Sequence, residues 1–543
     1  MKPSNNKNIN QDIMAPANYS QSAAVQTEVT GETNQKTTNI FQTIETKFLW
    51  ILTCVFALAG IALRIEKALL GRSFRGDEAA MATAILYHSI VELATKPLGN
   101  TVTAPLGFLV IEKAAIQLLG HQDLIYRLIP LLGGCISVIL MFFLTRELLG
   151  NFGATFAVGA FSLNWMLSFY SSDLKQYSTD VVIALIIYLM AARYLKNNTT
   201  TNLLWLAGIG LIGILCSHPA IFLLSPIGLA LVYQTWGDRR ELKKLFLVGA
   251  LWISVFLVLY FLSYRIVGQN SYNVSYWNNL GALMPMPPWK NPGWFVQRLG
   301  NFFVVDLNLP QWTVIEAALY LFGIILFFRR QNRSWSFIFL GSMLFTFAAS
   351  GIANYPFKGR LILFLAPSTF LAIGAGIDGL ALKMKSLSFL SHGIRWVLTA
   401  FLLVGPVTST YNYLNEPRPY PFNEDIKPAL LYVEQHKEAN DQFVVYDQAD
   451  FTYEYYAPFY GLSKSDTIVL GDFRKQPQKY RLAIDALPKN QRIWFIFTNV
   501  LKTLNDVSDS SYIFDYISTI GGKVIERYGG DDTFSSAYLV IIK

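Results

Sequence analysis

The sequence predicts an α-helical protein that crosses a membrane many times and carries a small α/β domain at its C-terminal end. Of its 543 residues, 53% are hydrophobic and only 15% are charged, whereas soluble domains carry about 25% charged residues. Long apolar runs recur from residue 48 to residue 411. Charged residues return after residue 412, where helical and strand patterns alternate, as is typical of an α/β domain.

Residues 1–47 are polar and rich in Asn, Gln, Ser and Thr. A segment of this composition cannot bury a core, so we expect a disordered cytoplasmic tail. We do not expect a signal peptide, because the first apolar run starts late and many others follow it.

The apolar runs between residues 48 and 411 predict about eleven spanning helices, each of which needs about 17–25 mostly apolar residues. They are Phe48–Leu70, Leu124–Leu148, Phe152–Tyr170, Thr179–Leu195, Leu203–Ser217, Ala220–Trp236, Leu245–Val267, Trp312–Phe328, Trp335–Ala353, Leu361–Leu382 and Ile394–Tyr411. Another run, Pro105–Gly120, is short and carries Glu112 and Lys113 in its middle. We expect it to lie along the membrane surface as an amphipathic helix, and a short tilted span is the alternative.

The basic loops indicate the orientation. If Pro105–Gly120 does not span, the basic residues around positions 146, 193–196, 239–244, 329–333 and 383–395 all fall on one side. The positive-inside rule makes that side cytoplasmic. Two large loops, 71–123 and 268–311, and the C-terminal domain, 412–543, then lie on the outer face. We attribute the net charge of +8 to the short basic loops on the cytoplasmic side. We therefore expect a membrane-lipid environment and no nucleic-acid partner.

The C-terminal segment contains four strand patterns, "DQFVVYD", "DTIVLGD", "RIWFIFTN" and "SAYLVIIK", with helical stretches between them. This alternation predicts a largely parallel sheet. The three cysteines, Cys54, Cys135 and Cys216, all lie in apolar runs, so neither a disulfide framework nor a CxxC metal site is expected.

Ionisable side chains gather at the predicted outer ends of the helices. They are Asp77 and Glu78 in "SFRGDEAAMATA", Arg127 at the start of the second span, Asp173 and Lys175 in "SSDLKQYS", His218 in "CSHPA", and Lys358 and Arg360 in "NYPFKGR". Helix packing could bring these distant turns together. Cations at the bilayer surface suit a phosphate group, and a carboxylate beside them stays ionised and can act as a base. Such a site fits group transfer from a lipid-linked donor.

Each of these residues also has a purely structural interpretation. Asp77 could cap the helix that follows, and Glu78 could compensate its dipole. The lysines and arginine could be interfacial anchors, and His218 could be an ordinary interface histidine. In the loop 268–311, Trp289 could stack on a sugar or belong to the aromatic belt of the membrane interface. Only the joint arrangement favours a functional site.

The order and spacing of these motifs resemble the GT-C superfamily of polyprenyl-phosphate-dependent glycosyltransferases, in particular the protein O-mannosyltransferase and aminoarabinose (lipid A) transferase group. The resemblance covers about Phe48–Tyr411 and the plan of an outer C-terminal domain. The motifs that carry it are "RGDEA", "TAPLGFLVIEKAAIQLLG", "LIYRLIPLLGG", "TRELLGNFGA", "SSDLKQYS", "CSHPAIFLL" and "YPFKGRLILFLAP". Two departures are Ala104 for the first proline of a Pro-Pro-Leu motif and Lys175 for an arginine.

The resemblance implies a glycosyltransferase of the bacterial plasma membrane whose active site faces outward. The donor substrate would be a polyprenyl-phosphate-linked sugar, the acceptor a hydroxyl or phosphate on a lipid, glycan or protein, and the reaction would invert the anomeric carbon. By position, Asp77 would be the base or the acceptor-orienting carboxylate, and Glu78 would support it or bind acceptor or metal. The donor phosphate would be bound by Lys175, Tyr177, Tyr355, Lys358 and Arg360, and further substrate contacts could come from Arg127, His218 and Trp289. The family includes members with and without a divalent metal, so both remain open.

Three other functions are alternatives to a glycosyltransferase. A lipid or glycan transporter or flippase would place its ionisable residues near the bilayer midplane and would show internal repeats, neither of which the sequence displays. A non-enzymatic scaffold would leave the acidic pair unexplained. An oligosaccharide ligase would differ by acting on a diphosphate-linked glycan.

Overall fold

The computed structural model describes residues 20–99, 102–264, 271–310, 312–329, 333–383, 388–415, 424–502, 506–530 and 534–543. The chain forms two compact units, Met1–Leu52 and Thr53–Lys543, and the first long helix, α1 (Ser20–Leu69), belongs to both. Helix α1 therefore begins within the segment 1–47, for which the sequence predicts disorder. Residues 1–19, the start of the second outer loop and the start of the C-terminal domain, 416–423, lie outside the described residues. The predicted domain boundaries stay predictions.

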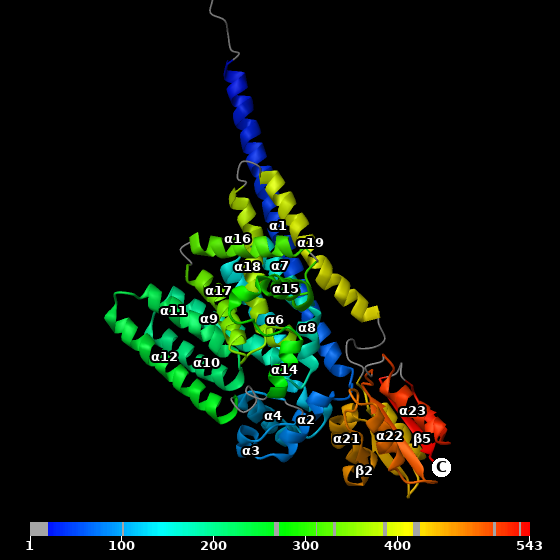
Figure 1. Ribbon diagram of the computed structural model, residues 1–543. Helices are drawn as coiled ribbons and strands as arrows, with labels where there is room; N and C mark the ends of the chain where they lie inside the picture. Colours follow the sequence, from blue (N-terminus) through cyan, green and yellow to red (C-terminus); the bar gives the residue numbers. More distant parts are fainter. Residues whose placement is uncertain are drawn as a thin grey trace, which may run out of the picture. The chain divides into compact units, whose positions relative to one another are not determined.

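Every one of the eleven predicted spans contains a helix in the structure (Figure 1). Among the described residues, seven helical segments are long and apolar enough to cross a membrane, and an eighth is obtained if one bent pair counts as a single span. The seven are Gln42–Leu69 of α1, α6 (Leu128–Leu148), α9 (Tyr177–Lys196), Arg239–Leu262 with α12 (Arg239–Leu259), α17 (Arg333–Gly351), Gly359–Leu380 with η5 (Gly359–Leu365) and α18 (Ala366–Lys383), and Leu390–Asn415 of α19 (Ser388–Asn415). Three further predicted spans contain shorter helices, which are α10 (Thr200–Cys216), α11 (Ala220–Gln234) and α16 (Thr313–Arg329). The polytopic helical fold class is confirmed.

The bent pair consists of α7 (Asn151–Leu163) and α8 (Trp165–Phe169), which is followed by the short helix η1 (Tyr170–Ser172). The bend of 52° lies at Asn164. The Asn164 side chain accepts a hydrogen bond from the Leu167 backbone N–H at 2.9 Å and so begins a new helix. This break directs the chain toward the turn that contains Asp173 and Lys175.

The centre of the bundle packs closely at glycines. A Cβ atom at Gly323 of α16 would lie 1.8 Å from the Ala372 carbonyl oxygen of α18, and one at Gly376 would lie 2.3 Å from the Leu319 oxygen. Small residues at such positions let two helix backbones approach each other in a membrane, where dispersion contacts rather than water drive packing.

The first outer loop contains α2 (Gly76–Tyr87), α3 (Ile90–Thr95), α4 (Leu106–Leu119) and α5 (Asp123–Tyr126). The segment Pro105–Gly120 thus forms the predicted helix, α4, which is not among the candidate spans. Its position relative to the bilayer stays a prediction. The second outer loop contains α14 (Ser271–Asn279), η3 (Pro288–Lys290), α15 (Pro292–Asn301) and η4 (Phe302–Asp306).

The C-terminal part is an α/β domain with a mixed sheet. Its strands are β1 (Gln442–Val445), β2 (Thr467–Val469), β3 (Arg492–Thr498), β4 (Lys523–Tyr528) and β5 (Ser535–Ile541), in the order β2-β1-β3-β5-β4. Its helices are α20 (Lys427–His436), α21 (Asp450–Tyr456), α22 (Gln478–Asp485) and α23 (Asp509–Thr519), with short turns η7 (Asp447–Ala449), η8 (Ala457–Tyr460) and η9 (Lys464–Asp466).

The expectation of a largely parallel sheet is only half right. β2, β1 and β3 are parallel, whereas β5 is antiparallel to both β3 and β4. The sequence patterns did not predict β4, because it is a mostly exposed edge strand without a buried apolar run. Because the connection between β4 and β5 is short, the two strands must pair antiparallel.

The first outer loop and the C-terminal domain share one hydrophobic core. The fully buried ring of Phe74 lies 5.5 Å from the ring of Tyr126, 5.1 Å from that of Tyr455 and 5.9 Å from that of Tyr456. The Phe74 N–H also donates to the Tyr456 hydroxyl at 2.9 Å. Figure 1 shows α2 beside α21 accordingly. The C-terminal domain therefore packs onto the segment that leads into the acidic pair.

Candidate active site

The acidic pair occupies the first turn of α2. The chain is extended at Arg75 and becomes helical at Gly76. The Glu78 carboxylate reaches back to accept a hydrogen bond from the Arg75 backbone N–H at 3.1 Å. Glu78 thus makes the helix-capping contact, whereas the structural interpretation of the sequence gives that role to Asp77. The Asp77 carboxylate lies instead beside Lys175 and Arg360.

Glu78 joins three separate segments of the chain. Its fully buried side chain pairs with Arg72 at 2.7 Å and with Arg127 at 3.3 Å, and it accepts a hydrogen bond from the Leu174 N–H at 2.8 Å. Burial alone would raise the pKa of Glu78, but the charges of Arg72, Arg127 and Arg75 outweigh it and hold the pKa well below its usual range. Because both of its oxygens are engaged, Glu78 serves as an internal anchor.

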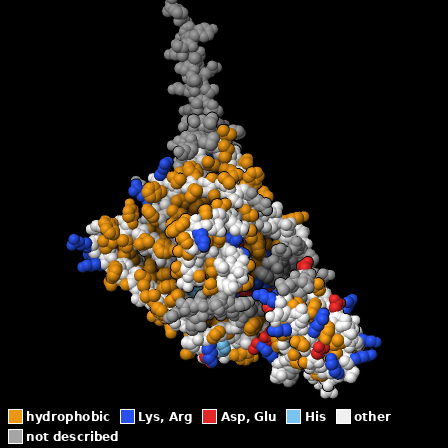
Figure 2. Space-filling view, viewed as in Figure 1, with side chains coloured by type: hydrophobic (Ala, Val, Ile, Leu, Met, Phe, Trp, Pro, Cys, Tyr) orange, Lys and Arg blue, Asp and Glu red, His pale blue; other side chains and the backbone are white. Residues whose placement is uncertain are grey.

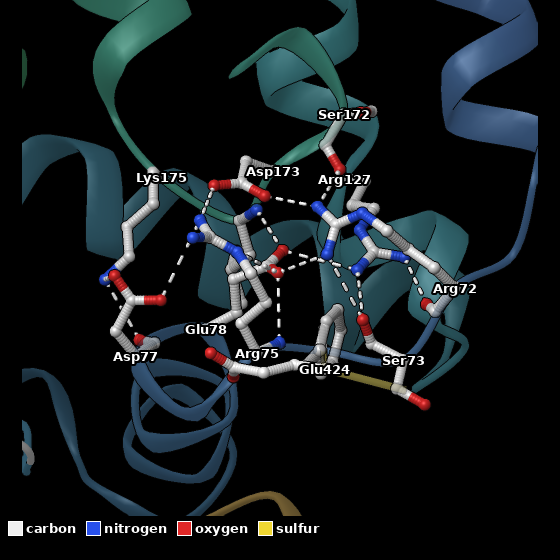
Figure 3. Close-up of polar contacts among 12 residues, drawn as sticks. Arg72, Ser73, Arg75, Asp77, Glu78, Arg127, Ser172, Asp173, Lys175 and Glu424 are labelled. Atoms are coloured by element: carbon white, nitrogen blue, oxygen red, sulfur yellow. Dashed lines mark hydrogen bonds and ion pairs between the residues drawn. The ribbon is translucent and has the colours of Figure 1, made fainter. Parts of the chain in front are cut away.

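A second buried carboxylate, Asp173, lies between two guanidinium groups (Figure 3). One of its oxygens pairs with Arg72 and the other with Arg75. Both arginines also lie over the ring of Phe169, at 5.2 and 5.6 Å from its centroid. The pairing fixes the Asp173 turn against the start of α2.

Asp77 is the accessible member of the group, with 19% of its side chain exposed. Its Oδ2 atom lies 3.4 Å from Lys175 Nζ and 3.3 Å from Arg360 Nη2, and its Oδ1 atom lies 3.9 Å from Arg75 Nη2. Lys175 Nζ also donates to the Asp77 carbonyl oxygen at 2.9 Å. Burial acts to raise the pKa of Asp77, but Lys175, Arg75 and Arg360 together hold it far below its ordinary value. Asp77 is therefore ionised at neutral pH.

Arg360 comes from η5, far along the chain from Asp77. Its guanidinium carbon lies 5.4 Å from the ring centroid of Tyr177, and 27% of its side chain is exposed. Lys175 is 3% exposed, and burial lowers its pKa while the charge of Asp77 raises it. Two cations from different turns thus approach one oxygen of one carboxylate.

Of the other predicted site residues, Arg127 is buried against Glu78, and the rest have different contacts. The Tyr355 hydroxyl donates to the Leu361 carbonyl oxygen at 2.6 Å, and Lys358 Nζ donates to the Leu280 carbonyl oxygen at 3.3 Å. Burial lowers the pKa of His218 to about 4, so its ring is neutral at pH 7. The Trp289 side chain is 80% exposed. The structure thus joins Asp77 directly to Lys175 and Arg360, whereas these hydrogen bonds of Tyr355 and Lys358 go to backbone carbonyl groups elsewhere.

Sequence reasoning missed four residues of the site. Arg72 and Arg75 precede the acidic pair by a few positions, and this local concentration of charge was a usable signal. Glu424 and Asp425 had no such signal. Glu424 accepts a hydrogen bond from the Gly76 N–H at 2.7 Å, and Asp425 accepts one from the Ser73 hydroxyl.

The charges around Asp77 bear on the open question of a metal. Among the described residues, no group of three or more His, Cys, Asp or Glu side chains is arranged to hold a metal ion. A divalent ion at Asp77 would also have to displace two cations, which Coulomb repulsion disfavours. The arrangement suits an anion beside the carboxylate.

Comparison with known proteins gives one match at the level of sequence. Residues 102–264 match the family model described as dolichyl-phosphate-mannose-protein mannosyltransferase. This segment contains the motifs from "TAPLGFLVIEKAAIQLLG" to "CSHPAIFLL", so the predicted resemblance to polyprenyl-phosphate-dependent glycosyltransferases is confirmed there. No curated protein sequence matches the chain.

Several solved structures are similar at low identity. The Archaeoglobus fulgidus oligosaccharyltransferase, in complex with Zn and sulfate, is 13% identical with a TM-score of 0.49, over 82% of this chain and 67% of that one. ArnT from Cupriavidus metallidurans bound to undecaprenyl phosphate is 12% identical with a TM-score of 0.48, over 91% of this chain and 98% of that one. TM-scores below 0.5 do not establish a common fold.

Proposed function

We propose that this chain is a membrane glycosyltransferase that moves a sugar from a polyprenyl-phosphate-linked donor to an acceptor on the outer face of the membrane. The observation that carries the proposal is the contact of the partly exposed Asp77 carboxylate with Lys175 and Arg360. The match of residues 102–264 to the family model described as dolichyl-phosphate-mannose-protein mannosyltransferase supports it.

Lys175 and Arg360 are the proposed binding groups for the donor phosphate. Both reach the same oxygen of Asp77, at 3.4 and 3.3 Å, so a phosphate placed beside that carboxylate could receive hydrogen bonds from both. When the bond between the anomeric carbon and the phosphate oxygen breaks, negative charge collects on the phosphate. Two fixed cations stabilise that charge more in the transition state than in the bound donor.

Asp77 is the proposed contact for the acceptor. The acceptor oxygen attacks the anomeric carbon from the side opposite the phosphate and forms the new C–O bond while the bond between that carbon and the phosphate oxygen breaks. Polyprenyl phosphate leaves, and the proton of the acceptor passes to water. A carboxylate whose pKa is strongly lowered is a weak base, so Asp77 suits orientation of the acceptor O–H and stabilisation of the positive charge that develops on the sugar. Attack from the opposite side inverts the anomeric carbon.

Glu78, Arg72, Arg75, Arg127 and Asp173 form the proposed support. They are nearly or fully buried, with at most 10% of a side chain exposed, and pair with one another. They hold the start of α2 and the Asp173 turn in one geometry, so that the reacting groups need not reorganise during the reaction. Tyr177, Tyr355 and Lys358 remain proposed donor-phosphate residues, and His218 and Trp289 remain proposed contacts for other parts of the substrates.

The experiment that tests the function compares a deletion strain with strains complemented by the wild type or by Asp77→Asn. We expect the deletion strain and the Asp77→Asn strain to accumulate the same polyprenyl-phosphate sugar, and the wild type to consume it. The outer leaflet must be assayed separately. A transporter would instead leave the sugar–phosphate bond intact and change only the leaflet in which the lipid is found.

The proposed sidedness has its own test. In a cysteine-free background, Leu482→Cys on α22, where the native side chain is 69% exposed, should react with a membrane-impermeant maleimide in intact cells. Arg240→Cys, in the first turn of α12, should react only after the membrane is opened. Labelling in the reverse order would place the C-terminal domain in the cytoplasm and contradict the proposal.

A further inference from the structure

A groove opens where α11 ends and α12 begins, far from the acidic pair. Its volume is ≈ 490 Å³, within the range of about 300–1,000 Å³ that is common for ligand pockets. It is lined by Val232, Leu242, Lys243, Phe246 and Leu247. In Figure 1 the turn between these helices lies at the left edge, away from α2. The groove is therefore separate from the candidate active site.

The walls of the groove are apolar and face outward. The side chains of Phe246 and Leu247 are 75% and 68% exposed. They belong to the segment Arg239–Leu262, a candidate span of which only 17% is buried inside the protein. In a membrane, such a surface contacts lipid chains rather than water.

The start of α12, which contributes Lys243 to the lining of the groove, is basic. Arg239, Arg240 and Lys243 are exposed, and in the described part of the chain no carboxylate pairs with them. The nearby carboxylates are engaged elsewhere, since Asp238 caps α12 by accepting from the Arg240 and Glu241 N–H groups and Glu241 pairs with Lys244 at 2.7 Å. Figure 2 shows Lys or Arg side chains beside hydrophobic ones at the left edge, where the turn between α11 and α12 lies in Figure 1.

Aromatic side chains mark the level of the membrane surface at this place. Trp236 and Tyr233 are 79% and 59% exposed, and exposed Trp and Tyr at the end of a span are typical of the headgroup region. The three unpaired cations follow within a few residues. They thus lie where lipid phosphates are found, while the groove runs toward the acyl chains.

We infer that this groove binds one anionic glycerophospholipid of the surrounding leaflet. One acyl chain lies along Val232, Phe246 and Leu247, and the headgroup phosphate contacts Lys243 with Arg239 and Arg240 beside it. A lipid with net negative charge complements the three cations, whereas the choline group of a zwitterionic lipid is repelled by them. By the predicted orientation this leaflet is the cytoplasmic one, so the site goes beyond the proposed transfer reaction and does not depend on it.

The test is native mass spectrometry of the full chain released from nanodiscs that contain equal amounts of phosphatidylglycerol and phosphatidylcholine. We expect the wild type to retain one phosphatidylglycerol, and the triple variant Arg239→Gln, Arg240→Gln, Lys243→Gln to retain it about tenfold less, because each cation near the surface adds attraction. The matched control removes three cations from the same predicted face outside the groove, with Arg146→Gln, Lys196→Gln and Arg333→Gln, and should retain the lipid as the wild type does.

A second variant tests the apolar half of the site. Leu247→Trp fills the groove and should lower retention, whereas Ile253→Trp, at an exposed position further along α12, should not. Equal retention of both lipids by the wild type would overturn the inference, as would undiminished retention by the triple variant. Displacement of phosphatidylglycerol by added polyprenyl phosphate, at equal concentration, would likewise overturn it by assigning the groove to the carrier lipid.

Discussion

Glu424 accepts a hydrogen bond from the Gly76 N–H at 2.7 Å, although 348 positions of the chain separate the two residues. Gly76 begins α2, and Asp77 follows it directly. Glu424 lies at the entrance to the C-terminal domain, next to Asp425, which holds Ser73. The C-terminal domain therefore contacts the backbone of the residue directly before the acidic pair, in addition to sharing a hydrophobic core with this segment.

This relationship predicts a positioning role for Glu424. Glu424→Ala removes the acceptor and should lower kcat about tenfold or more, since a hydrogen bond to a charged group contributes about 1.5–3 kcal/mol, while KM for the donor changes little. Glu424→Gln keeps an acceptor oxygen and should retain most of the activity. Steady-state kinetics of both variants check this, and equal losses in the two would contradict the hydrogen bond as the cause.

Asp77→Asn should lower kcat by about 10²–10⁴, the range typical of a lost acid–base or orienting group. The protein should still insert and fold, because the buried pairs of Glu78 and Asp173 are left intact. Transfer assays with matched amounts of protein measure the effect. Glu92→Gln, an exposed carboxylate in the same outer loop that pairs with Lys96, is the control, and near-wild-type transfer by Asp77→Asn would remove Asp77 from the mechanism.

Lys175→Ala should raise KM for the lipid donor, because one of the two cations proposed to bind its phosphate is lost. Lys175→Arg keeps the charge and should recover much of the affinity. The exposed Lys96→Ala provides a matched control for the loss of a lysine in the outer region. Donor titrations at saturating acceptor give the result, and an unchanged KM in Lys175→Ala would argue against the phosphate role.

Asp306 predicts a pH dependence of stability. Burial raises its pKa to about 7, although the Gly359 N–H and Arg298 oppose the shift. The folded state therefore keeps a proton that the unfolded chain, with a pKa of about 3.9, has lost, so this residue costs stability as pH rises from about 4 to 7. Asp306→Asn, which can still accept from Gly359, should raise Tm relative to the wild type more at pH 8 than at pH 5. A difference in Tm that is independent of pH would contradict this.

The main helices and the local parts of the site could be predicted from the sequence. Spans such as Tyr177–Lys196 follow from the length of their apolar runs, since a bilayer selects for about 20 apolar residues in succession. The acidic pair stands out because charge beside a span is costly. The strands β1, β2, β3 and β5 were likewise visible as short buried patterns, whereas the exposed edge strand β4 was not.

The sequence by itself determined that the chain is a polytopic helical protein with a C-terminal α/β domain and a conspicuous Asp77–Glu78 pair. Only the tertiary structure decided how that pair divides its work. Glu78 is buried among arginines, whereas Asp77 is left partly exposed beside Lys175 and Arg360. The tertiary structure also places Glu424 against the Gly76 N–H at the start of α2. The physical reason is that hydropathy and capping are local properties of the chain, whereas burial and ion pairing depend on which distant turns the packing brings together.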